Sequence, residues 1–167
     1  MVKVAINGFG RIGRQAFKAM LERKGIEVVA INDLTDNETL ARLVQFDSVY
    51  GKFSGKVEAD DTSLSVDGKK IASLSERDPS QLPWKKLGVD VVLESTGVFR
   101  DPEQAKMHLD AGAKKVVISA PPKSSYCSQY LLNINTDQYD PSKEDIVSMA
   151  SCTTNSLGPM VKVLHEN

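Results

Sequence analysis

The hydrophobic positions of this chain fall into short continuous runs separated by stretches in which apolar residues have helical spacing. Continuous apolar runs of this length are typical of strands that are buried on both faces of a parallel sheet. Such runs occupy residues 2–6, 26–31, 89–94, 115–119 and 145–150. We expect a strand at each of these five places.

The stretches between the runs predict three helices. The first starts at Arg11 and ends at Gly25, the second covers 39–46, and the third follows the Asp101-Pro102 pair, a cap with proline at the first helical position. The apolar residues expected to face the core are Ile12, Ala16, Ala19, Met20, Leu40, Leu43, Val44, Ala105 and Leu109.

Residues 51–88 have a different pattern, with short segments such as "SLSV" and "KIASL". Asp67-Gly68 separates these two segments and is a strong signal for a two-residue hairpin. We therefore predict a small antiparallel excursion from the main sheet.

Strands that alternate with helices predict an α/β fold with a parallel sheet covered on both faces. Ligands of such sheets bind beyond the carboxyl ends of the strands. Small or polar residues gather after each predicted strand, at 7–13, 32–34, 95–97, 119–121 and 151–155. The sequence therefore predicts a binding site at this edge.

Composition narrows the function classes. The net charge of −1 offers no basic patch for nucleic acid or an anionic membrane. No apolar run is long enough to span a bilayer and no signal peptide is visible, so we expect a cytoplasmic protein. Cys127, Cys152, His108 and His165 have no metal-ligand spacing, so we expect no metal site and two surface histidines on helices.

A GxGxxG motif follows the first strand and opens the first helix. In this context Gly8 permits a tight turn, Gly10 leaves room for a pyrophosphate, and Gly13 lets helix and strand pack closely. The free N–H groups near Arg11 and Ile12 would then face the anion, with the helix dipole behind them.

Asp33 lies 20 residues after Gly13, at the end of the second strand. A carboxylate at this position accepts hydrogen bonds from the ribose hydroxyls of NAD and repels the 2′-phosphate of NADP. The alternative is a glycine-rich turn and an unrelated surface aspartate. The order and spacing of strand, helix, strand and acidic residue favour the NAD-binding interpretation.

Cys152 follows a predicted strand and precedes a helical pattern. Helix N-termini stabilise thiolates, and Ser151, Thr153 and Thr154 supply hydroxyls that cap the helix or hold an anion. A thiolate beside a nicotinamide suggests covalent catalysis on an aldehyde. The alternative is that Cys152 has no chemical role and is a small side chain that fills the corner between strand and helix. Cys127, in a polar segment, is interpreted as an ordinary thiol.

Seven motifs occur in an order that is far more specific than any one of them. They are "INGFGRIGR" (6–14), "IND" (31–33), "FDSVYGKF" (46–53), "ERDP" (76–79), "ESTGVF" (94–99), "ISAP" (118–121) and "SCTTN" (151–155). Together they resemble the N-terminal half of the phosphorylating glyceraldehyde-3-phosphate dehydrogenases. Two features depart from this family: residues 122–134 are more polar than usual, and Ser156 replaces a frequent second cysteine.

The resemblance implies a Rossmann-type, doubly wound domain over 1–150, followed by the nucleophile loop and first helix of a catalytic domain over 151–167. It also implies a role for each matching position. Arg11 and Ile12, in the turn formed by Gly8, Gly10 and Gly13, would contact the pyrophosphate of NAD. Asp33 would bind the ribose, Arg77, Thr96, Gly97 and Phe99 would line the adenosine side, and Ser119 would lie on the nicotinamide side. Cys152 would be the nucleophile, and Ser151 and Thr153 would bind phosphate.

The family reaction is the oxidation of glyceraldehyde 3-phosphate with NAD and inorganic phosphate to 1,3-bisphosphoglycerate, usually by a homotetramer. In the family a histidine of the second domain activates the cysteine. His108 and His165 lie too far from Cys152 to replace it, so we expect this chain alone to bind NAD weakly and to be inactive. Two alternatives remain, erythrose-4-phosphate dehydrogenase and a non-catalytic NAD-binding module.

Overall fold

A computed structural model describes residues 1–167 and has one large sheet and one small one. The eight-stranded sheet has the order β10-β9-β8-β1-β2-β7-β6-β5. Its strands are β1 (Val2–Asn7), β2 (Ile26–Asn32), β5 (Val57–Asp60), β6 (Ser63–Val66), β7 (Lys69–Leu74), β8 (Val91–Glu94), β9 (Lys115–Ile118) and β10 (Ile146–Ser148). The separate antiparallel pair consists of β3 (Phe46–Asp47) and β4 (Gly51–Lys52).

The strands from β10 to β7 are parallel, and β6 and β5 extend the same sheet in antiparallel fashion. The chain moves from β1 to β2 and β7 on one side, then returns to place β8 on the other side of β1. The strand order therefore reverses between β1 and β8, as in doubly wound dinucleotide-binding folds. The expected hairpin is present, because Asp67 (φ 50°) and Gly68 (φ 81°) are both left-handed.

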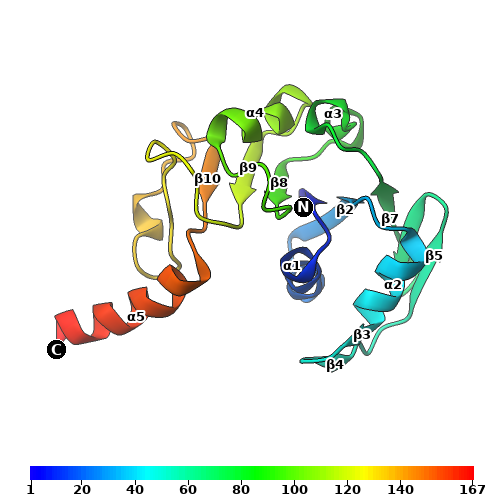
Figure 1. The fold of residues 1–167 in the computed structure, drawn as a ribbon, viewed down its shortest axis with the longest axis horizontal. Helices are drawn as coiled ribbons and strands as arrows, with labels where there is room; N and C mark the ends of the chain where they lie inside the picture. Colours follow the sequence, from blue (N-terminus) through cyan, green and yellow to red (C-terminus); the bar gives the residue numbers. More distant parts are fainter.

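Helices cover both faces of the sheet (Figure 1). α1 (Arg11–Leu21) and α2 (Asn37–Gln45) lie on one face, and α3 (Trp84–Leu87) and α4 (Pro102–Asp110) lie on the other. Short 3₁₀ turns, η1 and η2, occupy Pro79–Gln81 and Thr136–Gln138. Asp101 caps α4 as expected, because its side chain accepts a hydrogen bond from Glu103 N–H.

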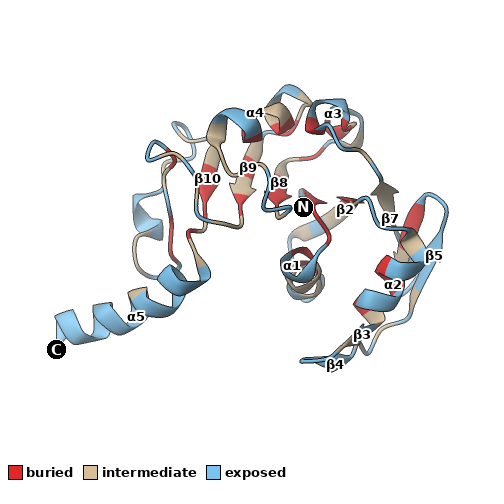
Figure 2. Cartoon of the chain, in the orientation of Figure 1, coloured by how far each residue is buried: buried red, intermediate tan, exposed pale blue.

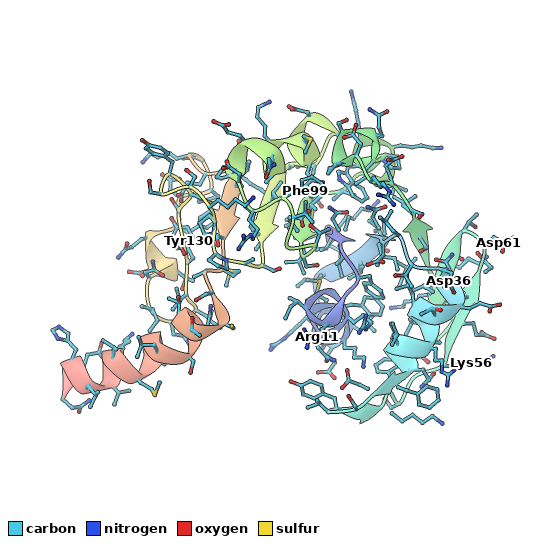
Figure 3. The ribbon with its side chains drawn as sticks, viewed as in Figure 1. Arg11, Asp36, Lys56, Asp61, Phe99 and Tyr130 are labelled. Atoms are coloured by element: carbon cyan, nitrogen blue, oxygen red, sulfur yellow. The ribbon has the colours of Figure 1, made fainter.

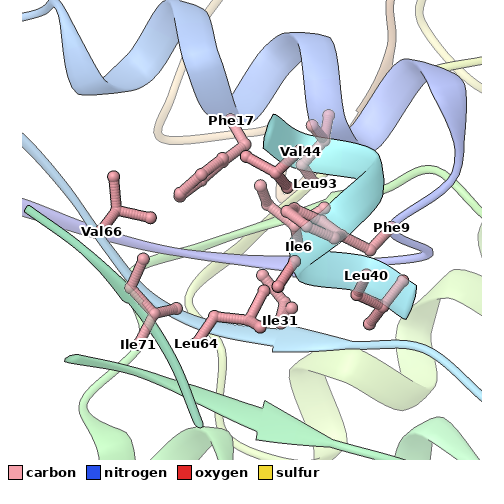
Figure 4. Packing of buried hydrophobic residues seen from close by; sticks show 11 residues of the cluster. Ile6, Phe9, Phe17, Ile31, Leu40, Val44, Leu64, Val66, Ile71 and Leu93 are labelled. Atoms are coloured by element: carbon pink, nitrogen blue, oxygen red, sulfur yellow. The ribbon is translucent and has the colours of Figure 1, made fainter. Parts of the chain in front are cut away.

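Successive side chains of the central strands point to opposite faces of the sheet and pack into separate hydrophobic cores. Ile6 and Ile31 face α1 and α2, where Phe9 packs edge-to-face on Phe17 with the ring centroids 5.4 Å apart (Figure 4). Their neighbours Ala5 and Ala30 pack in a second cluster with Trp84. The small alanine side chains leave room for the indole on that face. The fold class is therefore confirmed as a Rossmann-type sheet.

The predicted inner face of α1 was partly wrong. Gly13 and Phe17 are its buried residues, whereas Ile12 is exposed and Ala19 lies on the solvent side. A Cβ on Gly13 would lie only 2.2 Å from the Gly8 carbonyl oxygen, so the helix meets the strand at Gly13. The buried stripe therefore starts one residue later than the apolar spacing suggested. Leu43 of α2 is also exposed, unlike Leu40 and Val44.

The last helix has no buried face (Figure 2). α5 (Cys152–Glu166) projects from the end of β10, and Figure 1 shows it leading away from the sheet. Large apolar side chains on it are exposed, among them Leu157, Met160, Val161 and Leu164. The polar segment before β10 forms no strand of the main sheet and pairs only through an isolated bridge from Gln129 to Ser148.

Candidate functional site

A cavity of about 440 Å³ opens at the carboxyl ends of four neighbouring strands, where the strand order reverses. We call it the edge cavity. Figure 3 labels Phe99, which follows β8 and lines this cavity. The residues that line the edge cavity are Asn7, Gly8, Gly10, Asn32, Asp33, Leu34, Glu76, Arg77, Ser95, Thr96, Val98 and Phe99.

The three glycines of the motif differ in what surrounds them. Gly8 has φ +89°, and a Cβ there would lie 2.5 Å from the Thr96 backbone nitrogen. There is also no room for a Cβ on Gly13, which would clash with the Gly8 carbonyl oxygen. A Cβ on Gly10 would meet no protein atom within 4 Å, although Gly10 lines the edge cavity. Gly8 and Gly13 are therefore required by the fold, whereas Gly10 leaves space that a ligand can use.

The first turn of α1 is suited to an anion. Gly10 is its N-cap, no side chain caps the turn, and it contains no acidic residue. The N–H groups that open the helix therefore lack a side-chain acceptor, and the helix dipole adds positive potential there. Arg14 fixes the turn, because its guanidinium donates to the Phe9 carbonyl at 2.8 Å.

Asp33 joins the end of β2 to the glycine turn. Its Oδ2 accepts from Phe9 N–H at 2.7 Å, and its Oδ1 accepts from Thr35 N–H at 3.0 Å. Each carboxylate oxygen can accept a further hydrogen bond. The side chain is held in one orientation and still offers acceptors to the edge cavity, which suits ribose hydroxyls.

A larger cavity of about 660 Å³ lies next to this site and is not suited to phosphates. Its lining includes Asp36, Glu38, Asp60 and Asp61, and Figure 3 shows Asp36 and Asp61 beside α2 and β5. The backbone N–H of Thr62 and nearby hydroxyls donate to Asp60 and hold its pKa well below the ordinary value. This acidic cavity repels polyanions, so the edge cavity is the better dinucleotide site.

The structure brings together many, but not all, of the expected cofactor residues. Gly8, Gly10, Asp33, Arg77, Thr96 and Phe99 line the edge cavity. The remaining expected residues lie outside its lining: Arg11, Ile12, Gly13, Gly97, Ser119, Ser151, Cys152 and Thr153. Arg11 and Ile12 belong to the first turn of α1, and Ser119 follows β9 at the same edge of the sheet.

Cys152 is an exposed thiol at the first position of α5. Ser151 caps this helix, because its Oγ accepts from Thr154 N–H at 2.9 Å, and it also lies 2.8 Å from Thr153 Oγ1. β10 is three places from β1, so Cys152 is displaced from the glycine turn by about 15 Å across the sheet. It shares the carboxyl edge without lining the edge cavity.

Two further expectations concern the histidines and Cys127. His108 is not a surface residue, because it is fully buried between Glu94 and Trp84, whereas His165 is exposed on α5. Cys127 is buried, and this burial raises the pKa of its thiol. The sequence signal for the buried histidine was its position three residues after Ala105, on the inner face of α4.

Sequence comparison identifies the chain. The profile described as "Glyceraldehyde 3-phosphate dehydrogenase, NAD binding domain" matches residues 2–102. The chain belongs to the glyceraldehyde-3-phosphate dehydrogenase family. Proteins named glyceraldehyde-3-phosphate dehydrogenase from Thermotoga maritima, Geobacillus stearothermophilus and Mycoplasma pneumoniae are 60%, 53% and 51% identical to it. Each alignment covers 99% of this chain.

The chain is thus an NAD-binding domain of this dehydrogenase family, and NAD is its cofactor. It spans about half the length of the curated relatives it matches, covering 50%, 49% and 49% of them. None of its helices combines the length and the apolar character needed to cross a membrane.

Proposed function

We propose that the chain supplies the cofactor site and the nucleophile of an enzyme that oxidises glyceraldehyde 3-phosphate to 1,3-bisphosphoglycerate with NAD and inorganic phosphate. Residues 1–150 form the NAD-binding domain, and 151–167 begin the catalytic domain. The observation that supports this most strongly is the position of Cys152. It is an exposed thiol at the start of a helix, on the sheet edge that holds the edge cavity.

The geometry of the carboxyl edge supports the cofactor roles. The first turn of α1, with Arg11 and Ile12, receives the pyrophosphate, for which Gly10 leaves space. Asp33, which already accepts from Phe9 N–H, would accept from the hydroxyls of the adenosine ribose. Ser119, which follows β9 at the same edge, would lie on the nicotinamide side. The remaining residues, Gly8, Gly13, Arg77, Thr96, Gly97 and Phe99, shape the pyrophosphate turn and the adenosine side.

Cys152 carries the covalent chemistry. Its thiolate adds to the aldehyde carbon of the substrate and forms a thiohemiacetal. NAD, when bound, would supply the acceptor for the hydride on that carbon. The hydroxyl proton of the thiohemiacetal would pass to the catalytic base, so that a thioester would remain on the sulfur. Inorganic phosphate then attacks the thioester carbonyl, the carbon–sulfur bond breaks, and the acyl phosphate and the thiolate are released. Ser151 and Thr153 flank Cys152 in the chain, and their hydroxyl oxygens, 2.8 Å apart, would bind the phosphate.

The catalytic base lies outside residues 1–167. His108 is buried and already hydrogen-bonded, and His165 is thirteen residues along α5 from Cys152, about 20 Å away at helical rise. The chain alone therefore binds NAD weakly and does not turn over. The whole enzyme acts as a cytoplasmic homotetramer.

The test compares Cys152→Ser with Cys127→Ser in the full-length enzyme. We expect Cys152→Ser to abolish phosphate-dependent NADH production from glyceraldehyde 3-phosphate and to retain NAD binding. Cys127→Ser should keep activity, because this buried thiol packs among apolar side chains and does not line the edge cavity. An active Cys152→Ser enzyme contradicts the proposal. A preference for erythrose 4-phosphate, or no turnover in the unmutated enzyme, would instead support one of the two alternatives.

A further inference from the structure

A continuous network of buried polar side chains lies beneath the edge cavity. It runs from Trp84 and His108, through Glu94 and Asn7, to Asn32. All five residues are buried. They come from α3, α4 and the ends of three neighbouring strands. A buried carboxylate is costly unless it is paired or fully hydrogen-bonded, so Glu94 requires an explanation.

The cavity end of the network fixes the orientation of both amides. The backbone N–H of Glu76 can only donate, and it donates to Asn32 Oδ1 at 2.8 Å. Asn32 Nδ2 must then donate to Asn7 Oδ1, at 2.7 Å. This leaves Asn7 Nδ2 to donate to Glu94 Oε2, at 2.6 Å. Each contact has only one possible donor.

The far end of the network fixes the proton on the imidazole. The indole N–H of Trp84 can only donate, and it donates to His108 Nδ1 at 3.0 Å. His108 therefore carries its proton on Nε2, which donates to Glu94 Oε2 at 3.0 Å. Asn7 Nδ2 and His108 Nε2 lie 3.4 Å apart because both donate to the same oxygen.

Glu94 accepts a hydrogen bond at every contact that it makes. Besides the two donors on Oε2, its Oε1 accepts from Thr96 N–H at 2.8 Å and from Thr96 Oγ1 at 2.5 Å. Four donors on one side chain indicate an ionised carboxylate, which forms stronger hydrogen bonds than a neutral acid. Thr96 Oγ1 in turn accepts from Val98 N–H at 3.1 Å, so the turn after β8 depends on this carboxylate.

The groups that Glu94 orients all line the edge cavity. Glu94 contacts Asn7 at the end of β1 and Thr96 after β8 directly. It orients Asn32, at the end of β2, through Asn7. We propose that Glu94 is a positioning residue for NAD, with His108 and Trp84 as its buried support. This inference rests on the proposed placement of NAD in the edge cavity. A preorganised set of donors and acceptors loses less conformational entropy when the ligand binds.

The first experiment is a matched pair of carboxylate-to-amide variants, Glu94→Gln and Glu144→Gln. Glu144 also accepts from a hydroxyl, that of Tyr130 at 2.5 Å, but it lies outside the edge cavity. NAD affinity is measured by calorimetry at a temperature at which circular dichroism shows every variant fully folded. We expect Glu94→Gln to weaken NAD binding about tenfold, because the amide disrupts hydrogen bonds that the carboxylate accepts. Glu144→Gln should bind NAD as the unmutated chain does.

A second pair decides the question if Glu94→Gln fails to fold. Thr96→Ser keeps the hydroxyl that donates to Glu94, whereas Thr96→Val removes it. We expect the valine variant to bind NAD about tenfold more weakly than the serine variant. Equal affinity of the two would overturn the proposal, because a role confined to folding changes the melting temperature but not the affinity of the folded chain.

The protonation pattern gives a readout that needs no ligand. The ¹⁵N shifts of the His108 ring should show a neutral imidazole protonated at Nε2 in the unmutated chain. A proton on Nδ1 would overturn the network as described. Failure of the unmutated chain to bind NAD would contradict the proposed function. Full NAD affinity in Glu94→Gln would contradict only the role of Glu94.

Discussion

The Gly10→Ala substitution distinguishes an effect on cofactor binding from an effect on the stability of the fold. Among the three glycines of the motif, Gly10 is the one whose added Cβ meets no protein atom within 4 Å. Its φ of −73° and ψ of −157° are open to residues other than glycine. The methyl group would therefore leave the folded chain unstrained and enter the space proposed for the pyrophosphate.

The two expected effects differ in size. The free energy of unfolding should change by no more than about 0.5 kcal/mol, since no contact is made or lost. NAD should lose at least one hydrogen bond between its pyrophosphate and the first turn of α1, which is worth about 2 kcal/mol for a charged acceptor. That loss corresponds to NAD binding that is about 30-fold weaker.

Urea unfolding and calorimetric titration with NAD measure the two quantities, and Gly25→Ala is the matched control. Gly25 also has open space around a Cβ, but its φ is +89° and it lies at the start of β2, on the opposite edge of the sheet. This variant should lose about 1–2 kcal/mol of stability. Its NAD affinity should be unchanged.

Two results would refute the reasoning about Gly10. One is a Gly10→Ala chain that binds NAD as tightly as the unmutated chain, which would mean that no phosphate approaches this turn. The other is a loss of stability as large as that of Gly25→Ala, which would mean that Gly10 is required by the fold and carries no information about the ligand.

Four further predictions follow from the same structure. Asp33→Ser should reduce the preference for NAD over NADP, and calorimetry that shows an unchanged ratio would contradict the ribose role. Iodoacetamide should alkylate exposed Cys152 well before buried Cys127, whose pKa is raised by burial; mass spectrometry that finds Cys127 labelled first would be inconsistent with the fold. The pKa of Asp60 is lowered on folding, so its stabilisation is present above the unfolded pKa and lost as pH falls through the folded one. Asp60→Asn should therefore reduce the loss of unfolding free energy, measured with urea, when the pH is lowered below about 4. An unchanged dependence of that free energy on pH would exclude this contribution. The apolar face of α5 should make the chain self-associate, and Leu157→Glu should reduce the scattered mass; a monomer at high concentration would show that the face does not associate.

The backbone of the carboxyl edge could be predicted because local chemistry determines it. A continuous apolar run, then glycines at 8, 10 and 13, then a helical pattern leaves few alternatives for β1 and α1. The capping pair at Asp101 likewise located α4 correctly. These features depend on residues that are close together in the sequence, so the pattern alone was sufficient.

The side-chain contacts that cross the fold could not be predicted in this way. Ile12 fits a helical apolar stripe by spacing, yet the close approach of Gly13 to Gly8 turns it to solvent. His108 has the same polarity as a surface residue, and only the packing of α3 against α4 places the Trp84 indole beside it. In the sequence, Glu94 looks like an ordinary polar residue at the end of a strand. Its four donors come from positions up to 87 residues away.

The central claim is that NAD lies across the carboxyl edge of the sheet, over the first turn of α1 and beside Asp33. Amide chemical shifts of the ¹⁵N-labelled chain during titration with NAD test this position directly. We expect the largest shifts at Gly10, Arg11 and Ile12, smaller ones at Asp33 and Thr96, and none in the acidic cavity. Shifts centred on Asp36, Asp60 and Asp61, with the α1 turn unaffected, would contradict the account.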